Sequence, residues 1–169
     1  MRVGEMLDRC IALERRAAEM YRRFAAQSPA GDELHGLWLR LAGEEDEHAA
    51  AIGRAIAAPA GAGQSRIDGW TEAVEEAERV LGEAEAATTS SRDDRLALAL
   101  DLERTEIDAL REALLVLAGQ ADAGAHATSR HAAELAEVAM RCSTDARVQL
   151  KAALVRAHER LAGGVSPAR

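Results

Sequence analysis

Aromatic side chains are scarce in this chain of 169 residues, which holds two tryptophans, one tyrosine and one phenylalanine. Prolines are equally few: Pro29, Pro59 and Pro167 all fall between segments that have a helical pattern. No stretch alternates between polar and apolar residues with the two-residue period of a strand, and Ala, Leu, Glu and Arg dominate the composition. These absences exclude a β-rich fold and predict an all-α protein.

Other absences narrow the function. Two cysteines, Cys10 and Cys142, stand far apart, so the chain has neither a disulfide framework nor a Cys-x-x-Cys zinc or rubredoxin-type site. A signal-peptide core and an apolar run long enough to span a bilayer are both missing, so we expect a cytoplasmic protein with no membrane partner. The net charge of −8 argues against a nucleic-acid partner.

The first half of the chain predicts a helical hairpin over residues 3–27 and 32–57. A short turn, Ser-Pro-Ala-Gly-Asp, separates the two helices, so they should run antiparallel. The first helix has an unbroken apolar stripe in alternating steps of four and three residues, and its fourth member is a glutamate. The stripe consists of Val3, Leu7, Cys10, Glu14, Ala17, Tyr21 and Phe24.

The second helix carries a Glu-x-x-His pair, Glu45 and His48, on the same stripe as Leu34, Trp38 and Leu41. Residues three apart on a helix share a face, so the carboxylate and the imidazole should point at one spot, as two metal ligands do. Glu14 lies about 16 residues before the centre of the turn and Glu45 about 15 after it. The hairpin should therefore bring these two carboxylates to the same height.

A long crossover should follow, because residues 57–65 are rich in Ala, Gly and Pro. It should carry a short extra helix with Trp70, Val74, Ala77 and Leu81 on one side. Ser91 is suited to cap the next helix, which we expect over residues 92–118. That helix again has a glutamate, Glu103, in an apolar stripe, and Glu106 lies one turn away at the edge of the stripe.

The last part of the chain allows two arrangements. Residues 125–162 could form one long helix, or two helices divided near Cys142, with Thr144 capping the second. A tight turn near residue 120 would bring Glu134 and Glu137 to the level of Glu103, whereas an extended connection over residues 120–143 would bring His158 there.

We favour His158, because an apolar face surrounds it. Its members are Leu150, Leu154, Ala157 and Leu161. His35, His126 and His131 have weaker claims. Residues 1–163 should form a single domain, and residues 164–169 a disordered tail.

Each of three predicted helices thus places a glutamate in an apolar stripe. An unpaired buried carboxylate costs several kcal/mol, and neighbouring like charges add to that cost. Protonation or a nearby arginine could offset the cost of one carboxylate, but a single bound cation would neutralise all of them. Carboxylate and imidazole ligands together suit iron, manganese or zinc better than calcium or magnesium.

Three segments resemble the metal-ligand helices of the rubrerythrins, in the ferritin-like superfamily. They are Ala-Leu-Glu-Arg-Arg-Ala-Ala-Glu-Met-Tyr around Glu14, Ala-Gly-Glu-Glu-Asp-Glu-His ending at His48, and Leu-Ala-Leu-Asp-Leu-Glu-Arg-Thr-Glu around Glu103. The resemblance implies an antiparallel ferritin-like four-helix bundle with a di-iron or related centre of one or two ions. It also implies that Glu14, Glu45 and His48 serve one metal, with Glu45 and Glu103 as bridges.

Further expectations follow from the resemblance. Tyr21 resembles the tyrosine that the family places near its metals. Glu106 is a further candidate ligand, and either His158 or the pair Glu134 and Glu137 must substitute for the family's second Glu-x-x-His, or the second metal site is lost. The family's second Glu-x-x-His pair and its rubredoxin module are both missing, so a redox cycle would need an external electron donor. The expected function is peroxide or dioxygen reduction by a homodimer. The alternatives are iron handling and a metal-free helical scaffold that serves in dimerisation.

Overall fold

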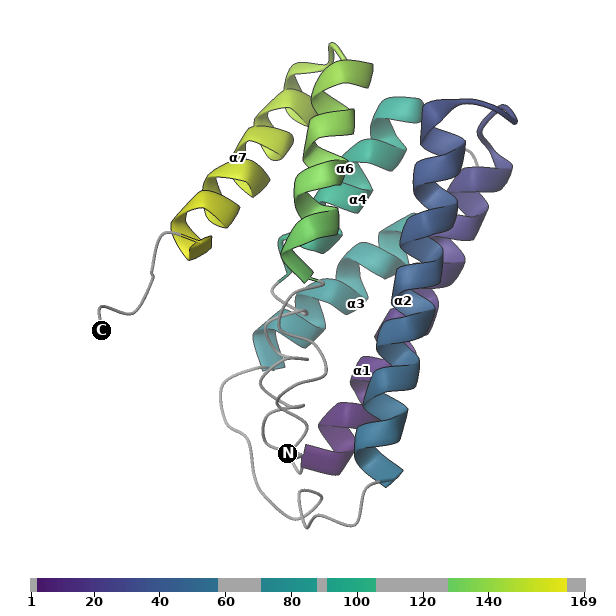
Figure 1. Cartoon of the computed structure of the whole chain (residues 1–169), viewed down its shortest axis with the longest axis vertical. Helices are drawn as coiled ribbons and strands as arrows, with labels where there is room; N and C mark the ends of the chain where they lie inside the picture. The colour runs from purple at the N-terminus through teal and green to yellow at the C-terminus, as the bar shows by residue number, and fades with distance from the viewer. Residues whose placement is uncertain (1–2, 58–70, 88–90, 106–127, 164–169) are drawn as a thin grey trace.

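The computed structural model describes residues 3–57, 71–87, 91–105 and 128–163 (Figure 1). Within these ranges all regular structure is helical, which confirms the all-α prediction. The helices are α1 (Val3–Ala26), α2 (Glu33–Ala57), α3 (Thr71–Ala86), α4 (Arg92–Glu103), α6 (Thr128–Cys142) and α7 (Ala146–Gly163). None of these described helices combines the length and the apolar character that a membrane span requires. The expected tail, residues 164–169, lies outside the described ranges.

The hairpin of α1 and α2 agrees closely with the prediction. Gly31 has a φ of 90°, a left-handed conformation that glycine adopts without strain and that closes the turn. The Asp32 side chain accepts a hydrogen bond of 2.9 Å from the backbone N–H of Leu34, so Asp32 caps α2 rather than beginning it. The predicted stripes of both helices face the interior, as the burial of Leu7, Tyr21, Leu34 and similar residues shows.

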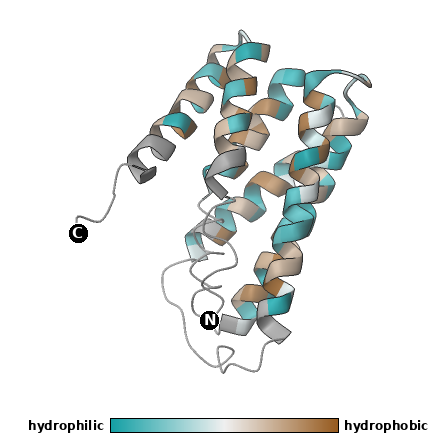
Figure 2. Cartoon of the chain, in the orientation of Figure 1, coloured by the Kyte–Doolittle hydropathy of each residue, from teal (hydrophilic) through white to brown (hydrophobic). Residues whose placement is uncertain are grey.

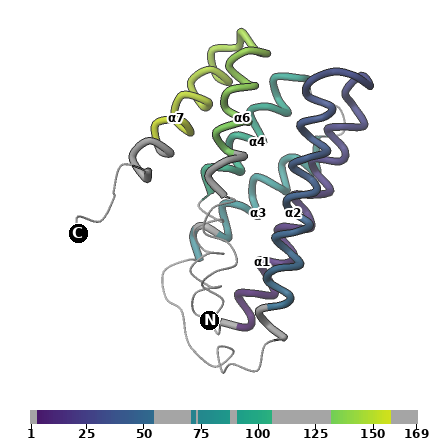
Figure 3. The backbone as a smooth tube through the Cα atoms, in the orientation of Figure 1, coloured from purple at the N-terminus to yellow at the C-terminus, as the bar shows by residue number. Residues whose placement is uncertain are grey.

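Two ion pairs fix the direction of α3. The guanidinium of Arg9 lies 2.8 Å from Glu78, and that of Arg16 lies 2.8 Å from Glu85, so both pairs join residues the same distance apart in the sequence. Helix α3 therefore runs parallel to α1, whereas α2, which lies between them in the sequence, runs in the opposite direction (Figure 3). The prediction of an extra helix between the second and third long segments is confirmed, and its buried members include Val74, Ala77 and Leu81.

Helix α4 begins as predicted but ends early. Ser91 and Asp94 form a reciprocal capping box, with the Ser91 hydroxyl accepting from the backbone N–H of Asp94. The periodicity predicts a helix that continues to residue 118, but α4 ends at Glu103. The reason is local: Thr105 bonds back to the carbonyl of Leu102 through both its backbone N–H (3.0 Å) and its hydroxyl (2.7 Å), which tightens the last turn. Residues 106–118 lie outside the described residues.

Helices α6 and α7 are separated by a break at residues 143–145, which confirms two helices divided near Cys142 and excludes one long helix. An extended connection over residues 120–143 is also wrong, because α6 occupies residues 128–142. The cap of α7 is Asp145 rather than Thr144, since the Asp145 carboxylate accepts a hydrogen bond of 2.7 Å from the backbone N–H of Arg147.

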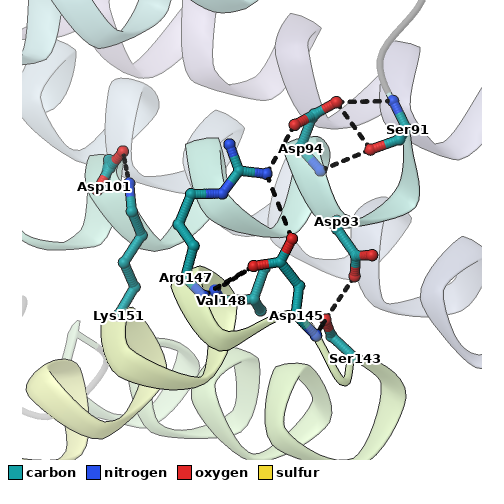
Figure 4. A network of polar contacts seen from close by, with 9 residues as sticks. All are labelled: Ser91, Asp93, Asp94, Asp101, Ser143, Asp145, Arg147, Val148 and Lys151. Atoms are coloured by element: carbon teal, nitrogen blue, oxygen red, sulfur yellow. Dashed lines mark hydrogen bonds and ion pairs between the residues drawn. The ribbon is translucent and has the colours of Figure 1, made fainter.

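The orientation of α7 also differs from the prediction. Val148, Ala152 and Val155 face the interior, whereas Leu150 and Leu154 are 62% and 45% exposed. Burial of the β-branched side chains on the interior side sets the orientation of the helix, and two ion pairs on its flank agree with it. Arg147 lies 2.8 Å from Asp94, and Lys151 contacts Asp101, both acids lying on α4 (Figure 4). The apolar face around His158 that the sequence predicted is therefore turned outward at these two leucines.

Apolar residues gather where the helices face one another, and charged residues lie mainly outside, Glu14, Glu45 and Arg95 being buried exceptions (Figure 2). The three aromatic residues of the first hairpin form one cluster: the rings of Tyr21 and Trp38 stack at 5.8 Å, and Phe24 meets Trp38 edge-on at 5.5 Å. All three are buried. This cluster lies about two helical turns from Glu14 and Glu45 on their own helices, at the end of the hairpin that is closed by the turn.

Candidate metal centre

Glu14 on α1 and Glu45 and His48 on α2 meet inside the first hairpin. One ligand atom from each residue lies within 4.8 Å of the others. The Nδ1 atom of His48 lies 2.9 Å from an oxygen of Glu45 and 3.8 Å from an oxygen of Glu14. The three side chains therefore meet as predicted from the position of the turn and the periodicity of the two helices.

All three side chains are buried in a helical interior. Glu14 is 3% exposed, Glu45 5% and His48 8%. Their neighbours along the stripes, such as Cys10 and Ile52, are apolar and fully buried. Water is therefore largely excluded from a group that contains two carboxyls and one imidazole, and these must satisfy one another or bind a cation.

The electrostatics of this cluster raise the pKa of Glu45 well above its ordinary value of 4.5. Burial is the main cause, and the negative charge of Glu14 adds to it, while the hydrogen bond with His48 acts in the opposite direction. Without a cation, the cluster therefore favours the protonated form of Glu45 more than solvent does. A bound metal ion would take the place of that proton, because a carboxylate binds metal only when it is ionised.

The donor set fits a transition-metal ion. Nitrogen and oxygen ligands about 2.1 Å from an ion lie about 3 to 4 Å from one another, so the distances found here need only small side-chain movements. One imidazole and two carboxylates, with a position left for water or substrate, are ligands that iron, manganese and zinc accept. Among the described residues this is the one group of three or more His, Cys, Asp or Glu side chains arranged in this way.

Glu103 is connected to the first hairpin through Tyr21. It is half-buried, and its carboxylate accepts a hydrogen bond of 3.1 Å from the Tyr21 hydroxyl. Tyr21 lies seven residues, or about two turns, after Glu14 on the same face of α1. Glu103 therefore contacts the aromatic cluster and does not belong to the three-residue group, and its role as a bridge between two metals stays a prediction.

Four of the other candidate ligands fall outside what the structure describes. Glu106 and His126 lie outside the described residues, as do the side chains of His131 and His158. Their roles as ligands stay predictions, and so does the second metal position that they would serve.

The described candidates outside the group have other contacts. Glu134 forms an ion pair with Arg40 at the surface, and Glu137 is exposed. The Nδ1 atom of His35 lies 3.0 Å from the backbone carbonyl of Ala25 and joins the ends of α1 and α2. None of these three side chains belongs to the buried group formed by Glu14, Glu45 and His48.

A second feature has no local sequence pattern: a groove of about 350 Å³ lined by α3, α4 and α7. Its charged lining residues already have partners, since Glu83 contacts Arg79, Asp94 contacts Arg147, and Asp101 contacts Lys151. The last two pairs join residues about 50 positions apart, so neither helical periodicity nor a local motif could reveal them. Their arrangement indicates a structural contact between α4 and α7 (Figure 4).

Comparison with known proteins gives no independent assignment. No family model matches the chain, and neither the curated proteins nor the solved structures yield a match. Any functional assignment therefore depends on the geometry of the site and on the class of protein that this geometry fits.

Proposed function

We propose that this protein binds a single transition-metal ion, iron in the first instance, through Glu14, Glu45 and His48. The observation that carries the proposal is the burial of two carboxyls and an imidazole within 4.8 Å of one another. Manganese and zinc are the other ions that this donor set accepts. The burial of the set favours a bound ion over an exposed acidic patch, because exposed acids need no compensation.

The helix directions support a ferritin-like bundle as the architecture of the protein. Helix α4 runs antiparallel to α1, because Tyr21 contacts Glu103 while Gln27 contacts Arg95. Helix α6 runs antiparallel to α2, since Arg141 pairs with Glu33 and Glu134 with Arg40. With α3 placed between α2 and α4 in the chain, the order α1, α2, α4, α6 has the directions of a bundle with one long crossover.

A redox reaction with peroxide or dioxygen is the activity proposed for such a centre. Bound iron would supply the exchange of electrons with the oxidant, and the chain supplies the dry pocket and the three ligands. The two cysteines are too far apart in the sequence to form a rubredoxin-type site, so electrons would come from a separate donor. Iron handling is the alternative: the same three ligands would bind the ion, which would then be stored or passed on.

The experiment is an anaerobic titration with Fe²⁺, followed by addition of hydrogen peroxide. The proposal expects saturable binding of about one ion per chain, a rise in the thermal midpoint, and a change in visible absorption when peroxide is added. Binding without an absorption change would support metal binding and refute the redox activity. An absence of saturable binding for Fe²⁺, Mn²⁺ and Zn²⁺ would refute the metal site itself.

A metal-free scaffold is the second candidate, and one observation favours it. The hydrogen bond of 2.9 Å between His48 and Glu45, with a proton held by the acid pair, satisfies part of the cluster without any ion. In that case replacing Glu45 by Gln would leave stability unchanged or raise it, and added metal would have no effect on either protein. The titration above separates this candidate from the first.

A further inference from the structure

One face of α7 differs from the exposed faces of the other helices. Within Ala146–Ala157 five positions, spaced so that they fall within an arc of about 100° on the helix, carry only apolar side chains. We call this the α7 strip; its members are Ala146, Leu150, Ala153, Leu154 and Ala157. The first four are exposed and Ala157 is half-buried, with Leu150 at 62% and Leu154 at 45%.

The α7 strip is distinct from the side of the helix that packs in the core. Val148, Ala152 and Val155 on the opposite side of the helix are buried, so α7 is apolar on both sides. Helix α7 lies at the edge of the described molecule, beside α6 (Figure 1). A helix with a second, solvent-facing apolar side is typical of an element that packs against another protein.

Charge singles out the same helix. The chain carries a net charge of −8, so two copies repel one another over most of their surfaces. Exposed carboxylates occur on α1, α2, α3 and α6, for example at Glu5, Glu33, Glu72 and Glu137. Residues 146–157 of α7 contain no acidic residue at all. Among the described helices, α7 over these residues is therefore where two copies meet with least repulsion.

The cations that border the strip next to α4 are already neutralised by the same molecule. Arg147 pairs with Asp94, and Lys151 pairs with Asp101, both acids lying on α4 (Figure 4). This border therefore presents no uncompensated positive charge to a second copy. On the other border, Arg156 lies 3.4 Å from the Met140 sulfur.

The shape of the strip is also complementary to itself. It contains two projecting leucines four residues apart, with alanines at the remaining positions. If two strips pack antiparallel about a two-fold axis between residues 150 and 154, Leu150 of one copy meets Leu154 of the other, and the alanines allow the helices to approach closely. We propose that the α7 strip is the interface of a homodimer formed by antiparallel packing of α7 against α7 of a second copy.

The interface is small, because it involves the exposed side of one helix from each copy. Contacts of this size fall below about 1,200 Å² of buried surface and give weak, concentration-dependent association. The residues of the metal site lie on other helices, so the dimer can fail while the proposed function stands, and the reverse also holds.

The test is sedimentation equilibrium of the full chain over a range of concentrations. Wild-type protein should show reversible dimerisation. Leu150→Glu and Leu154→Lys should each weaken it at least about tenfold, because each places an unpaired charge in an apolar contact. An equimolar mixture of the two variants should dimerise again, since the carboxylate introduced at position 150 of one copy would face the ammonium group introduced at position 154 of the other.

The matched control is Leu39→Glu, which changes a leucine on α2 that is 50% exposed and should leave association unchanged. Circular dichroism would verify that each variant is folded, as is expected for exposed positions. A wild-type monomer at every concentration would overturn the proposal, as would a Leu150→Glu protein that dimerises like the wild type. A mixture that stays monomeric would overturn the antiparallel pairing.

Discussion

Replacing Glu45 by Gln should make the metal-free protein more stable above neutral pH and should abolish its stabilisation by metal. Glutamine has the shape of a protonated glutamic acid and can still donate a hydrogen bond to Glu14, as the protonated acid does. Because the pKa of Glu45 is raised in the folded wild-type protein, its carboxyl keeps a proton at pH values just above 4.5, where the unfolded chain has released it. Glutamine does not titrate, so the substitution removes the difference in bound protons between the folded and unfolded states.

The sign of the pH dependence follows from the raised pKa. Between 4.5 and the raised pKa of Glu45, the folded state binds more protons than the unfolded state, so the wild-type protein loses stability as the pH rises. Two negative charges no more than 4.8 Å apart would repel by at least about 3 kcal/mol at an effective dielectric constant near 20. We therefore expect Glu45→Gln to exceed the wild type by about 1 to 3 kcal/mol at pH 8, and by much less near pH 5.

Urea unfolding of the metal-free proteins at pH 5, 6, 7 and 8 measures this difference directly. The control is Glu47→Gln, two residues along α2 at an exposed position, which should follow the wild type at every pH. A metal concentration about 100 times the dissociation constant should stabilise the wild type and the control by about 3 kcal/mol, but not Glu45→Gln. A pH-independent loss of stability in Glu45→Gln would refute the reasoning about the buried proton.

Three further predictions concern the helix contacts. Ser91→Ala removes the cap of α4 and should cost about 1 kcal/mol in the free energy of unfolding, measured with urea. Tyr21→Phe removes the hydrogen bond to Glu103 and should cost about 1 kcal/mol by the same assay, without reducing the number of ions bound at Glu14, Glu45 and His48. Lys151→Met should increase hydrogen exchange in α7 relative to α1, and added salt should have the same effect on the wild type, because both weaken the contact with Asp101.

The first hairpin could be predicted from the sequence almost residue by residue. Its stripes repeat in steps of four and three, and its turn is short and contains a glycine, so local rules determine the register of the two helices. That register was enough to predict the meeting of Glu14 with Glu45 and His48. Local periodicity succeeded here because the candidate ligands lie on the same stripes that form the core.

The second half of the chain was harder to predict. Helix α7 is apolar on two sides, and periodicity alone does not decide which side faces the interior; the prediction chose the wrong side for Leu150 and Leu154. The contacts of α7 with two aspartates on α4 join distant parts of the sequence, so local periodicity does not reveal them. The early end of α4 depends on the Thr105 hydroxyl bonding back to Leu102, an alternative to helix that a stripe of apolar residues does not reveal.

The most direct measurement of the central claim is the metal content of the protein, purified without chelators and analysed by mass spectrometry of the elements. We predict about one transition-metal ion per wild-type chain and the same content in Glu47→Gln. We predict a strong loss in His48→Gln and in Glu45→Gln, each of which removes one of the three ligands. A wild-type protein that holds no such ion, even after dialysis against Fe²⁺, Mn²⁺ or Zn²⁺, would contradict the claim.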